Sequence, residues 1–291
     1  MTEYQIFTVD AFASKPFEGN QAGIVPVPAD QPLSAETMLQ LAAEMAIAET
    51  AYLTPLSRNP GSLPFQTESH FNLRWFTPAY EVKLCGHATL AAAHVLFFEL
   101  NNTSDSLTFD TLSGDLTVSR NADGSLTMRF PQDKPEGVIV DQEYRTIVQA
   151  TLGHCREDVE VYLSPALNYL VIYDPQMTYQ GLRDVAPRFS AEALDARKAK
   201  GVMGLVVTSR GKDVDFESRF FDPWSGVDED PVTGSAHTVL APFWNERLQK
   251  SEFSAYQCSQ RGGSLGIELL DNGQVAVSGK GVVVIRGTLR L

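Results

Sequence analysis

The sequence predicts an α+β fold of two similar domains, in each of which a sheet wraps around a central helix. The first supporting observation is a repeat. An aromatic strand, a proline turn, an acidic loop and a glycine that opens an alanine-rich helix occur at 74–88 and again at 219–236. The two glycines, Gly86 and Gly234, are separated by about half of the 291 residues. A unit used twice at this spacing indicates two related domains.

The second observation is that residues 86–98 are apolar almost all round. A helix without a polar face is buried on every side, so a sheet is expected to surround it. The third is a run of short strands separated by turn residues, predicted at 106–111, 114–120 and 125–130.

The first elements follow from local pattern. Residues 4–12 are rich in β-branched and aromatic side chains, which predicts a strand, and 19–23 predict a turn before 24–27. Residues 35–46 show apolar positions at helical spacing. Ser34 provides the N-cap of this helix, and Leu33 and Met38 form its hydrophobic staple. A strand is expected next at 47–53.

The rest of the chain is punctuated by loops and turns. Residues 57–70 predict a loop before a strand at 71–76, and 131–136 predict a linker between the halves. A helix is expected near 141–152. The second half then repeats the strand order and ends in a helix at 234–247, which Pro242 should kink or shorten. Asn272-Gly273 predicts a closing hairpin, followed by a last strand at 281–287.

Composition excludes several classes of protein. A net charge of −13 argues against nucleic-acid binding, which needs a basic surface. No apolar run is long enough for a membrane span, and the first residues do not form a signal peptide. Cys85, Cys155 and Cys258 lack metal-ligand spacing, which indicates reduced thiols, no metal site and a cytoplasmic location.

The two helix starts at Gly86 and Gly234 suggest what the protein binds. A helix N-terminus offers free backbone N–H groups and a partial positive charge, so it attracts anions. Two such starts facing one cleft between the domains would form a site for a small anionic molecule.

Glu49 is the first candidate for chemistry, because it is a lone carboxylate among apolar neighbours. Desolvation there would raise its pKa toward the range of a general base. The alternative, which the residues alone favour, is a glutamate on an edge strand that points into water. His87, beside Gly86, is either structural or placed to move protons near neutral pH.

The second repeat offers Asp230 and Ser235. The acids at 228–230 either complement the helix dipole or bring Asp230 to the site, where Ser235 would hydrogen-bond a ligand. Ser235 lacks the context of a hydrolase nucleophile. Cys85 is either a thiol with a pKa lowered by the helix dipole or a small buried residue. Four histidines are given no role: His70, His94, His154 and His237.

These motifs together resemble the PhzF-like, or phenazine biosynthesis-like, proteins, which are relatives of diaminopimelate epimerase. The similarity covers essentially the whole chain in order. The matching segments are Asp10-Ala11-Phe12 with Gly19-Asn20, Ala48-Glu49-Thr50-Ala51, Phe76-Thr77-Pro78, Cys85-Gly86-His87-Ala88 and Asp230-Pro231-Val232-Thr233-Gly234-Ser235-Ala236. The resemblance implies a diaminopimelate epimerase-like fold of two barrel-like, mostly antiparallel domains. The expected domains are 1–130, joined by the last strand at about 281–291, and 131–280.

The resemblance also implies an isomerase that needs no cofactor or metal and serves a biosynthetic process. An acid matching Glu49 shuttles a proton in the characterised family member, on a dihydro-hydroxyanthranilate. The resemblance implies that the catalytic residues here are Glu49, His87, Asp230 and Ser235. It implies that the substrate-binding residues are Asn20, Cys85, Gly86, Thr233 and Gly234. A homodimer is one expected assembly.

The epimerase branch uses two cysteines, one before each glycine, whereas this chain has Cys85 and Thr233. A two-thiol racemisation is therefore not expected. The loop at 260–266 matches the family only loosely, which leaves its substrate contacts open. The expected activity is proton transfer on a small carboxylate-bearing, cyclic or unsaturated metabolite. The alternatives are a non-catalytic metabolite-binding protein that uses the same cleft, and a racemase with Cys85 as one base.

Overall fold

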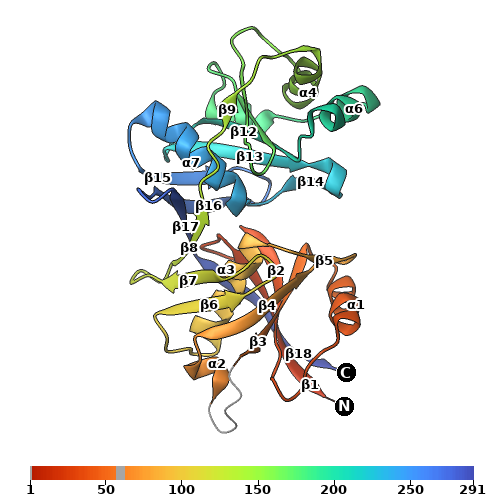
Figure 1. Cartoon of the computed structure of the whole chain (residues 1–291), viewed down its shortest axis with the longest axis vertical. Helices are drawn as coiled ribbons and strands as arrows, with labels where there is room; N and C mark the ends of the chain where they lie inside the picture. Colours follow the sequence, from red (N-terminus) through yellow and green to blue (C-terminus); the bar gives the residue numbers. More distant parts are fainter. Residues whose placement is uncertain (1, 57–62) are drawn as a thin grey trace. The chain divides into compact units, whose positions relative to one another are not determined.

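The computed structural model describes residues 2–56 and 63–291. The chain separates into two compact units (Figure 1). Unit 1 comprises Met1–Arg129 with Ser278–Leu291, and unit 2 comprises Phe130–Val277. The assignment of domains to 1–130 with about 281–291 and to 131–280 stays a prediction.

Unit 1 is a mixed sheet around helix α3, and most of its strand pairs are antiparallel (Figure 1). Strands β2 and β3 are parallel, as are β4 and β6. The elements of unit 1 are β1 (Glu3–Ala11), β2 (Asn20–Pro26), α1 (Ala35–Met45), β3 (Glu49–Pro55), α2 (Pro64–Thr67), β4 (His70–Phe76), β5 (Glu81–Val82), α3 (Gly86–His94), a π-helical turn (Val95–Glu99), β6 (Ser106–Asp110), β7 (Leu116–Arg120), β8 (Leu126–Pro131), which ends at the boundary with unit 2, and β18 (Gly281–Arg290).

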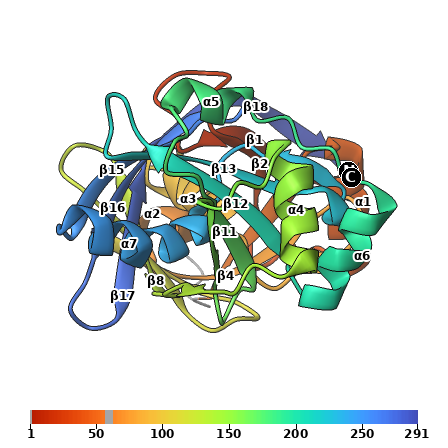
Figure 2. The same ribbon diagram turned by 90° about the horizontal axis from the view of Figure 1, so that it is seen from above.

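Unit 2 has the same kind of sheet, with helix α7 on one face and α4 and α6 side by side on the other (Figure 2). Strands β11 and β12 are parallel, as are β13 and β15. The elements of unit 2 are β9 (Glu136–Gly137), α4 (Gln142–Leu152), β10 (Glu160–Leu163), β11 (Tyr169–Tyr173), α5 (Tyr179–Asp184), α6 (Ala191–Lys200), β12 (Gly204–Arg210), β13 (Phe216–Asp222), a 3₁₀ turn (Pro223–Ser225), β14 (Val227–Asp230), α7 (Gly234–Leu248), β15 (Glu252–Gln257), β16 (Gly263–Leu269) and β17 (Gln274–Gly279), whose last residues belong to unit 1.

The two units share one topology. The path β2–β3–β4–β6–β7 pairs in the order parallel, antiparallel, parallel, antiparallel. The path β11–β12–β13–β15–β16 pairs in the same order. Helix α3 precedes β6 as α7 precedes β15. The repeat seen in the sequence is therefore a repeat of strand order, and the predicted α+β fold class is confirmed.

The central helices are buried as their composition predicts. Every residue of α3 from His87 to Ala93 is buried, as is every residue of α7 from Ala236 to Trp244. The first of these helices is shorter than the predicted 86–98. It is α-helical to His94 and continues as the π-helical turn.

Pro242 does not shorten α7, which continues to Leu248. A proline leaves the carbonyl four residues earlier without its helical donor. In this helix that carbonyl belongs to Thr238, and it accepts the backbone N–H of Asp133 at 3.2 Å. The carboxylate of Asp133 in turn accepts the N–H groups of Ala166 and Leu167. The segment 131–136, predicted as a linker, is thus partly buried and braces the helix.

Two loop predictions also change. The predicted turn at 19–23 is a strand from Asn20 onward, and only Gly19 turns the chain, at φ +68°. Any side chain at Gly19 would meet the carbonyl of Ala11. Residues 57–62 of the predicted loop lie outside the described residues, and α2 occupies part of the remainder. The other predicted helices and strands are found within a few residues of their expected bounds.

Among residues 2–56 and 63–291, no helix combines the length and apolar character needed to cross a bilayer.

Candidate active site

Glu49 is the first residue of β3, where parallel pairing places it opposite Ala22 of β2. Its side chain is only 19% exposed. Its Oε2 atom is buried and accepts no hydrogen bond from any described residue. The alternative of a glutamate that points into water is therefore wrong. A carboxylate that is largely removed from water is in the setting that proton transfer requires.

His87, the second residue of α3, faces this carboxylate. Its Nε2 atom lies 3.1 Å from Oε2 of Glu49, and its side chain is 9% exposed. This distance is that of an ion pair, although the relative orientation of the two side chains is poor for a hydrogen bond. Nδ1 of the same ring lies 3.5 Å from Sγ of Cys85, the N-cap residue of α3. The first strand-to-helix unit thus gathers an acid, an imidazole and a thiol.

The charges of this cluster shift the pKa of Glu49 in the direction opposite to that predicted. Burial acts to raise the pKa of Glu49, but the adjacent His87 outweighs it and leaves that pKa below its usual value. Burial acts to lower the pKa of His87, but Cys85 and Glu49 raise it well above its usual value. The predicted upward shift of Glu49 is therefore wrong, because the sequence did not reveal which residue lies beside it. At neutral pH the two form a carboxylate–imidazolium pair.

Cys85 is buried, and burial together with the charge of Glu49 raises the pKa of its thiol. A thiolate stabilised by the helix dipole is thus not formed near neutral pH, and of the two readings of Cys85 the structure favours the small buried residue.

Glu49, Cys85 and His87 are also the described residues that could hold a metal ion. Their ligand atoms all lie within 4.8 Å of one another. Such a carboxylate, thiolate and imidazole set suits zinc, provided that the thiol and the imidazole lose their protons.

The remaining predicted residues of unit 1 are Asn20 and Gly86. Asn20 is buried at the start of β2, the strand that runs parallel to β3. Gly86 is the first residue of α3, where the backbone N–H groups of the opening turn have no partner within the helix. Asn20 thus lies on the strand beside that of Glu49, and Gly86 directly precedes His87 in α3.

In unit 2, Asp230 ends β14 and Thr233 is the N-cap residue of α7. The hydroxyl of Thr233 donates a hydrogen bond to the carboxylate of Asp230. Gly234 and Ser235 follow as the first two residues of the helix. Ser235 therefore occupies the helical position that His87 occupies in α3, as the repeat predicts.

Gln257, at the end of β15, fixes this second cluster and is fully buried. Its amide donates to the carbonyl of Asp230 at 2.7 Å and accepts the N–H of Thr233 at 2.8 Å. Sequence reasoning missed this residue. A signal was available, because Phe253, Ala255 and Gln257 alternate on the buried face of the strand and only the last is polar.

Tyr169 is a second residue that sequence reasoning missed. Its hydroxyl lies 3.2 Å from Oγ of Ser235, and its ring packs edge-on against Phe220. Burial raises the pKa of Tyr169, so its hydroxyl remains protonated near neutral pH. Two neutral hydroxyl groups thus lie together at the start of α7.

Each unit has an arginine–glutamate pair ahead of its central helix. Arg74 binds Glu81 through Nε and Nη2, both at 2.7 Å. Arg219 binds Glu229 in the same way, at 2.6 and 2.8 Å. Such paired hydrogen bonds fix the relative orientation of the two side chains. They join β4 to β5 and β13 to β14, the hairpins that precede α3 and α7.

The glycine-rich stretch at 260–266 is not a loop throughout, because β16 begins at Gly263. Gly262 has φ +67°, and a side chain there would overlap the hydroxyl of Tyr256. Packing against Tyr256 within unit 2 therefore explains why position 262 is a glycine.

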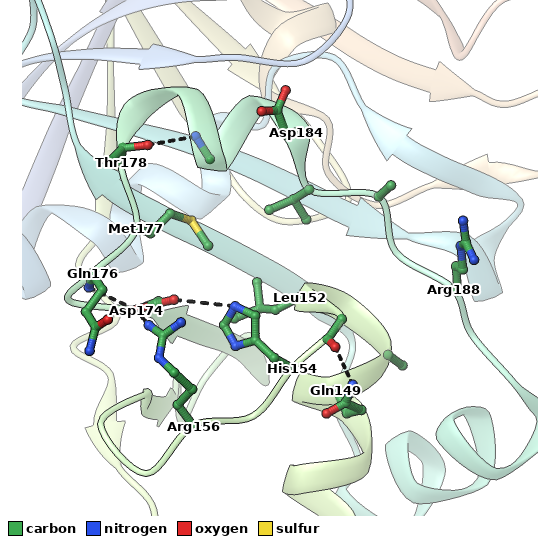
Figure 3. A pocket seen from close by; sticks show the side chains of 15 residues that line it. Gln149, Leu152, His154, Arg156, Asp174, Gln176, Met177, Thr178, Asp184 and Arg188 are labelled. Carbon is green, nitrogen blue, oxygen red and sulfur yellow. Dashed lines mark hydrogen bonds and ion pairs between the residues drawn. The ribbon is translucent and has the colours of Figure 1, made fainter.

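Of the four histidines that were given no role, His237 contacts the second cluster, because its Nδ1 atom lies 2.9 Å from the carbonyl oxygen of Thr233. Burial lowers the pKa of His94 and of His237 to about 4, so both are neutral. His70 contacts Ser69. His154 lies 3.6 Å from the buried carboxylate of Asp174, at a cavity of about 620 Å³ in unit 2 (Figure 3). None of the predicted site residues lines that cavity.

Comparison with known proteins places these features in a family. Residues 9–287 match the family model of PhzC–PhzF, phenazine biosynthesis-like proteins. A protein of Pseudomonas aeruginosa named as an uncharacterized isomerase is 40% identical over 291 residues, covering 99% of this chain and 100% of its own length.

Solved structures agree. A putative phenazine biosynthesis PhzC/PhzF protein from Clostridium difficile has a TM-score of 0.84 at 33% identity, covering 99% of this chain and all of its own. A hydroxyproline epimerase from Agrobacterium vitis has a TM-score of 0.56 at 10% identity over 99% of this chain and 93% of its own, a likeness of fold alone. The chain belongs to the PhzC–PhzF family of phenazine biosynthesis-like proteins.

Proposed function

We propose that this protein is an isomerase that moves a proton on a small carboxylate-bearing substrate, cyclic or unsaturated, with Glu49 as the base. The observation that carries the proposal is the largely buried carboxylate of Glu49, whose Oε2 atom lies 3.1 Å from Nε2 of His87. The adjacent imidazole lowers the pKa of Glu49, so the carboxylate stays ionised and can accept a proton. The uncharacterized isomerase of P. aeruginosa, 40% identical along its whole length, supports the same class of reaction.

In the proposed reaction, the carboxylate of Glu49 removes a proton from a carbon of the substrate and returns it to another carbon. The electron pair that is left moves into the conjugated system and toward the substrate carboxylate. The N–H groups at Gly86 and His87 would stabilise the charge that develops there. The imidazolium of His87 keeps Glu49 ionised before the transfer and can donate a hydrogen bond to the intermediate.

We propose that the cluster at the start of α7 binds the same substrate. Its support is the repeat, which gives α7 a helix start equivalent to that of α3. The backbone N–H groups of Gly234 and Ser235 and the Ser235 hydroxyl would hold a carboxylate. Asp230, hydrogen-bonded to Thr233, would orient or relay a proton on a neighbouring group.

Proton transfer of this kind needs a base and a stabilised anion, and these residues supply both. We therefore propose that no cofactor takes part. The experiment that tests the function begins with mass spectrometry of the small molecules released when the purified protein is denatured. A released carboxylate is then incubated with chelator-treated protein in deuterium oxide. Exchange of one carbon-bound hydrogen supports the isomerase, whereas tight binding without exchange supports a metabolite-binding protein instead.

A further inference from the structure

A second cavity in unit 2, of about 780 Å³, lies between α6, the segment 185–189 and the β13–β14 hairpin. Its volume is in the usual range for small-molecule sites. Its lining includes the carboxylates of Asp228 and Glu229 and three aromatic and three cationic side chains: Phe189, Phe221, Trp224, Arg197, Lys198 and Arg219.

This cavity lies on the opposite face of the hairpin from the Asp230 cluster. Phe220 pairs with Asp230 across the two strands, and its ring packs against Tyr169. Side chains along a strand alternate between faces. Arg219 and Phe221, on either side of Phe220, therefore point away from that cluster, and they line the cavity.

Arg219 forms a wall of the cavity and is already bound within unit 2. It is bound to Glu229 through two hydrogen bonds, and its Nη1 atom donates to the carbonyl groups of Leu182, Arg183 and Val185. Its positive charge is thus already neutralised.

Arg197 differs. Its guanidinium lies over the ring of Trp224, 4.4 Å from the centroid. Its Nε atom is buried without a hydrogen-bond partner, and Nη2 contacts only Sδ of Met203, at 3.8 Å. No carboxylate of the described residues lies within ion-pair distance of it. The pKa of Asp222 is raised by burial despite the charge of Arg197, and its carboxylate accepts a hydrogen bond from Ser225. The terminal N–H groups of this guanidinium thus lack a strong acceptor, and a carboxylate in the cavity would supply one.

The aromatic side chains beside Arg197 are held in place. Phe189 meets Trp224 edge to face, with ring centroids 6.0 Å apart. The indole N–H of Trp224 donates to the carbonyl of Met203 at 3.0 Å, which fixes the ring. A planar ring attached to the bound carboxylate would pack against these two side chains.

We propose that this cavity binds a small aromatic carboxylate, whose carboxylate is held by Arg197 and whose ring packs on Phe189 and Trp224. Lys198, at the rim, adds a second positive charge. Glu49 plays no part in this binding, so the site is separate from the proposed isomerase chemistry.

The probe for the test is 4-fluorobenzoate, and the neutral 4-fluorobenzyl alcohol is its control. Binding is followed by ¹⁹F NMR and by tryptophan fluorescence. Trp75 and Trp244 are each only 1% exposed, so a fluorescence change reports on Trp224. The expected result is saturable binding of the benzoate, a matching fluorescence change and at least tenfold weaker binding of the alcohol.

Two variants locate the site. Arg197→Gln should weaken binding of 4-fluorobenzoate at least tenfold, and Arg197→Lys should weaken it less, because it keeps the charge but loses the planar fork. Arg210→Gln, on an exposed arginine of β12, is the matched control and should have no effect. The proposal is overturned if the benzoate fails to bind at millimolar concentration, if Arg197→Gln binds like wild type, or if Ser235→Ala abolishes the binding.

Discussion

The carboxylate of Glu49 and the imidazole of His87 form a buried pair, with Nε2 and Oε2 3.1 Å apart. One residue begins a strand and the other lies in the first turn of a helix, so the fold rather than the local sequence brings them together. The pair sets the charge of each member. The account of function rests on it.

Replacement of His87 by Gln should change the pH dependence of turnover. His87 lowers the pKa of Glu49, whereas burial acts to raise it. Without the imidazolium only the effect of burial remains, so the pKa of Glu49 rises and a larger fraction of it is protonated at mildly acidic pH. The acidic limb of the rate profile should therefore move to higher pH. The check is kcat/KM measured across pH for both proteins, and an unmoved acidic limb contradicts the proposed pairing.

Cys85→Ala should be a mild substitution, with turnover reduced less than tenfold. The thiol is buried and its pKa is raised, so it is neither a thiolate nor a ready base. Turnover and circular dichroism of the variant are the measurements. A well-folded Cys85→Ala protein without activity would instead favour the racemase.

Gln257→Leu should destabilise unit 2 and weaken substrate binding. The change leaves the carbonyl of Asp230 and the N–H of Thr233 without their buried partner, which costs about 1–3 kcal/mol. The free energy of unfolding in urea measures the first effect and KM the second. Gln180→Leu, at an exposed glutamine of α5, is the control. Equal stability of both variants would show that Gln257 does not hold the cluster.

Sulfate should bind at the start of α7. The N–H groups of Gly234 and Ser235 and the Ser235 hydroxyl offer donors to an anion. The measurement is electron density near Gly234 in crystals soaked in sulfate, with Ser235→Ala as comparison. Absence of density at high sulfate concentration argues against an anionic substrate at this position.

Local pattern predicted the elements well where local chemistry decides them. Ser34 caps α1 by accepting the N–H of Thr37 at 3.1 Å, as its position before an apolar repeat indicates. The apolar run after Gly86 is the central helix of unit 1. The repeat predicted the shared strand order because the same turns and apolar runs occur twice.

Prediction failed where a distant partner decides the outcome. Pro242 continues its helix because Asp133 supplies the missing donor from another segment. The pKa of Glu49 shifts downward because His87, remote in sequence, lies beside it. The roles of Gln257 and Tyr169 depend on strands that meet only in the folded unit. None of these partners can be read from the neighbouring residues.

Glu49→Gln tests the central claim most directly. The amide keeps the size of the side chain but cannot accept a proton, so the chemical step alone should be lost, by a factor of about 10²–10⁴ or more. The measurement is deuterium incorporation into the co-purified carboxylate in deuterium oxide, together with its binding by calorimetry, for wild type, Glu49→Gln and Cys85→Ala. The account predicts that Glu49→Gln binds the carboxylate without exchange while Cys85→Ala exchanges it. Exchange by Glu49→Gln at the wild-type rate would contradict it.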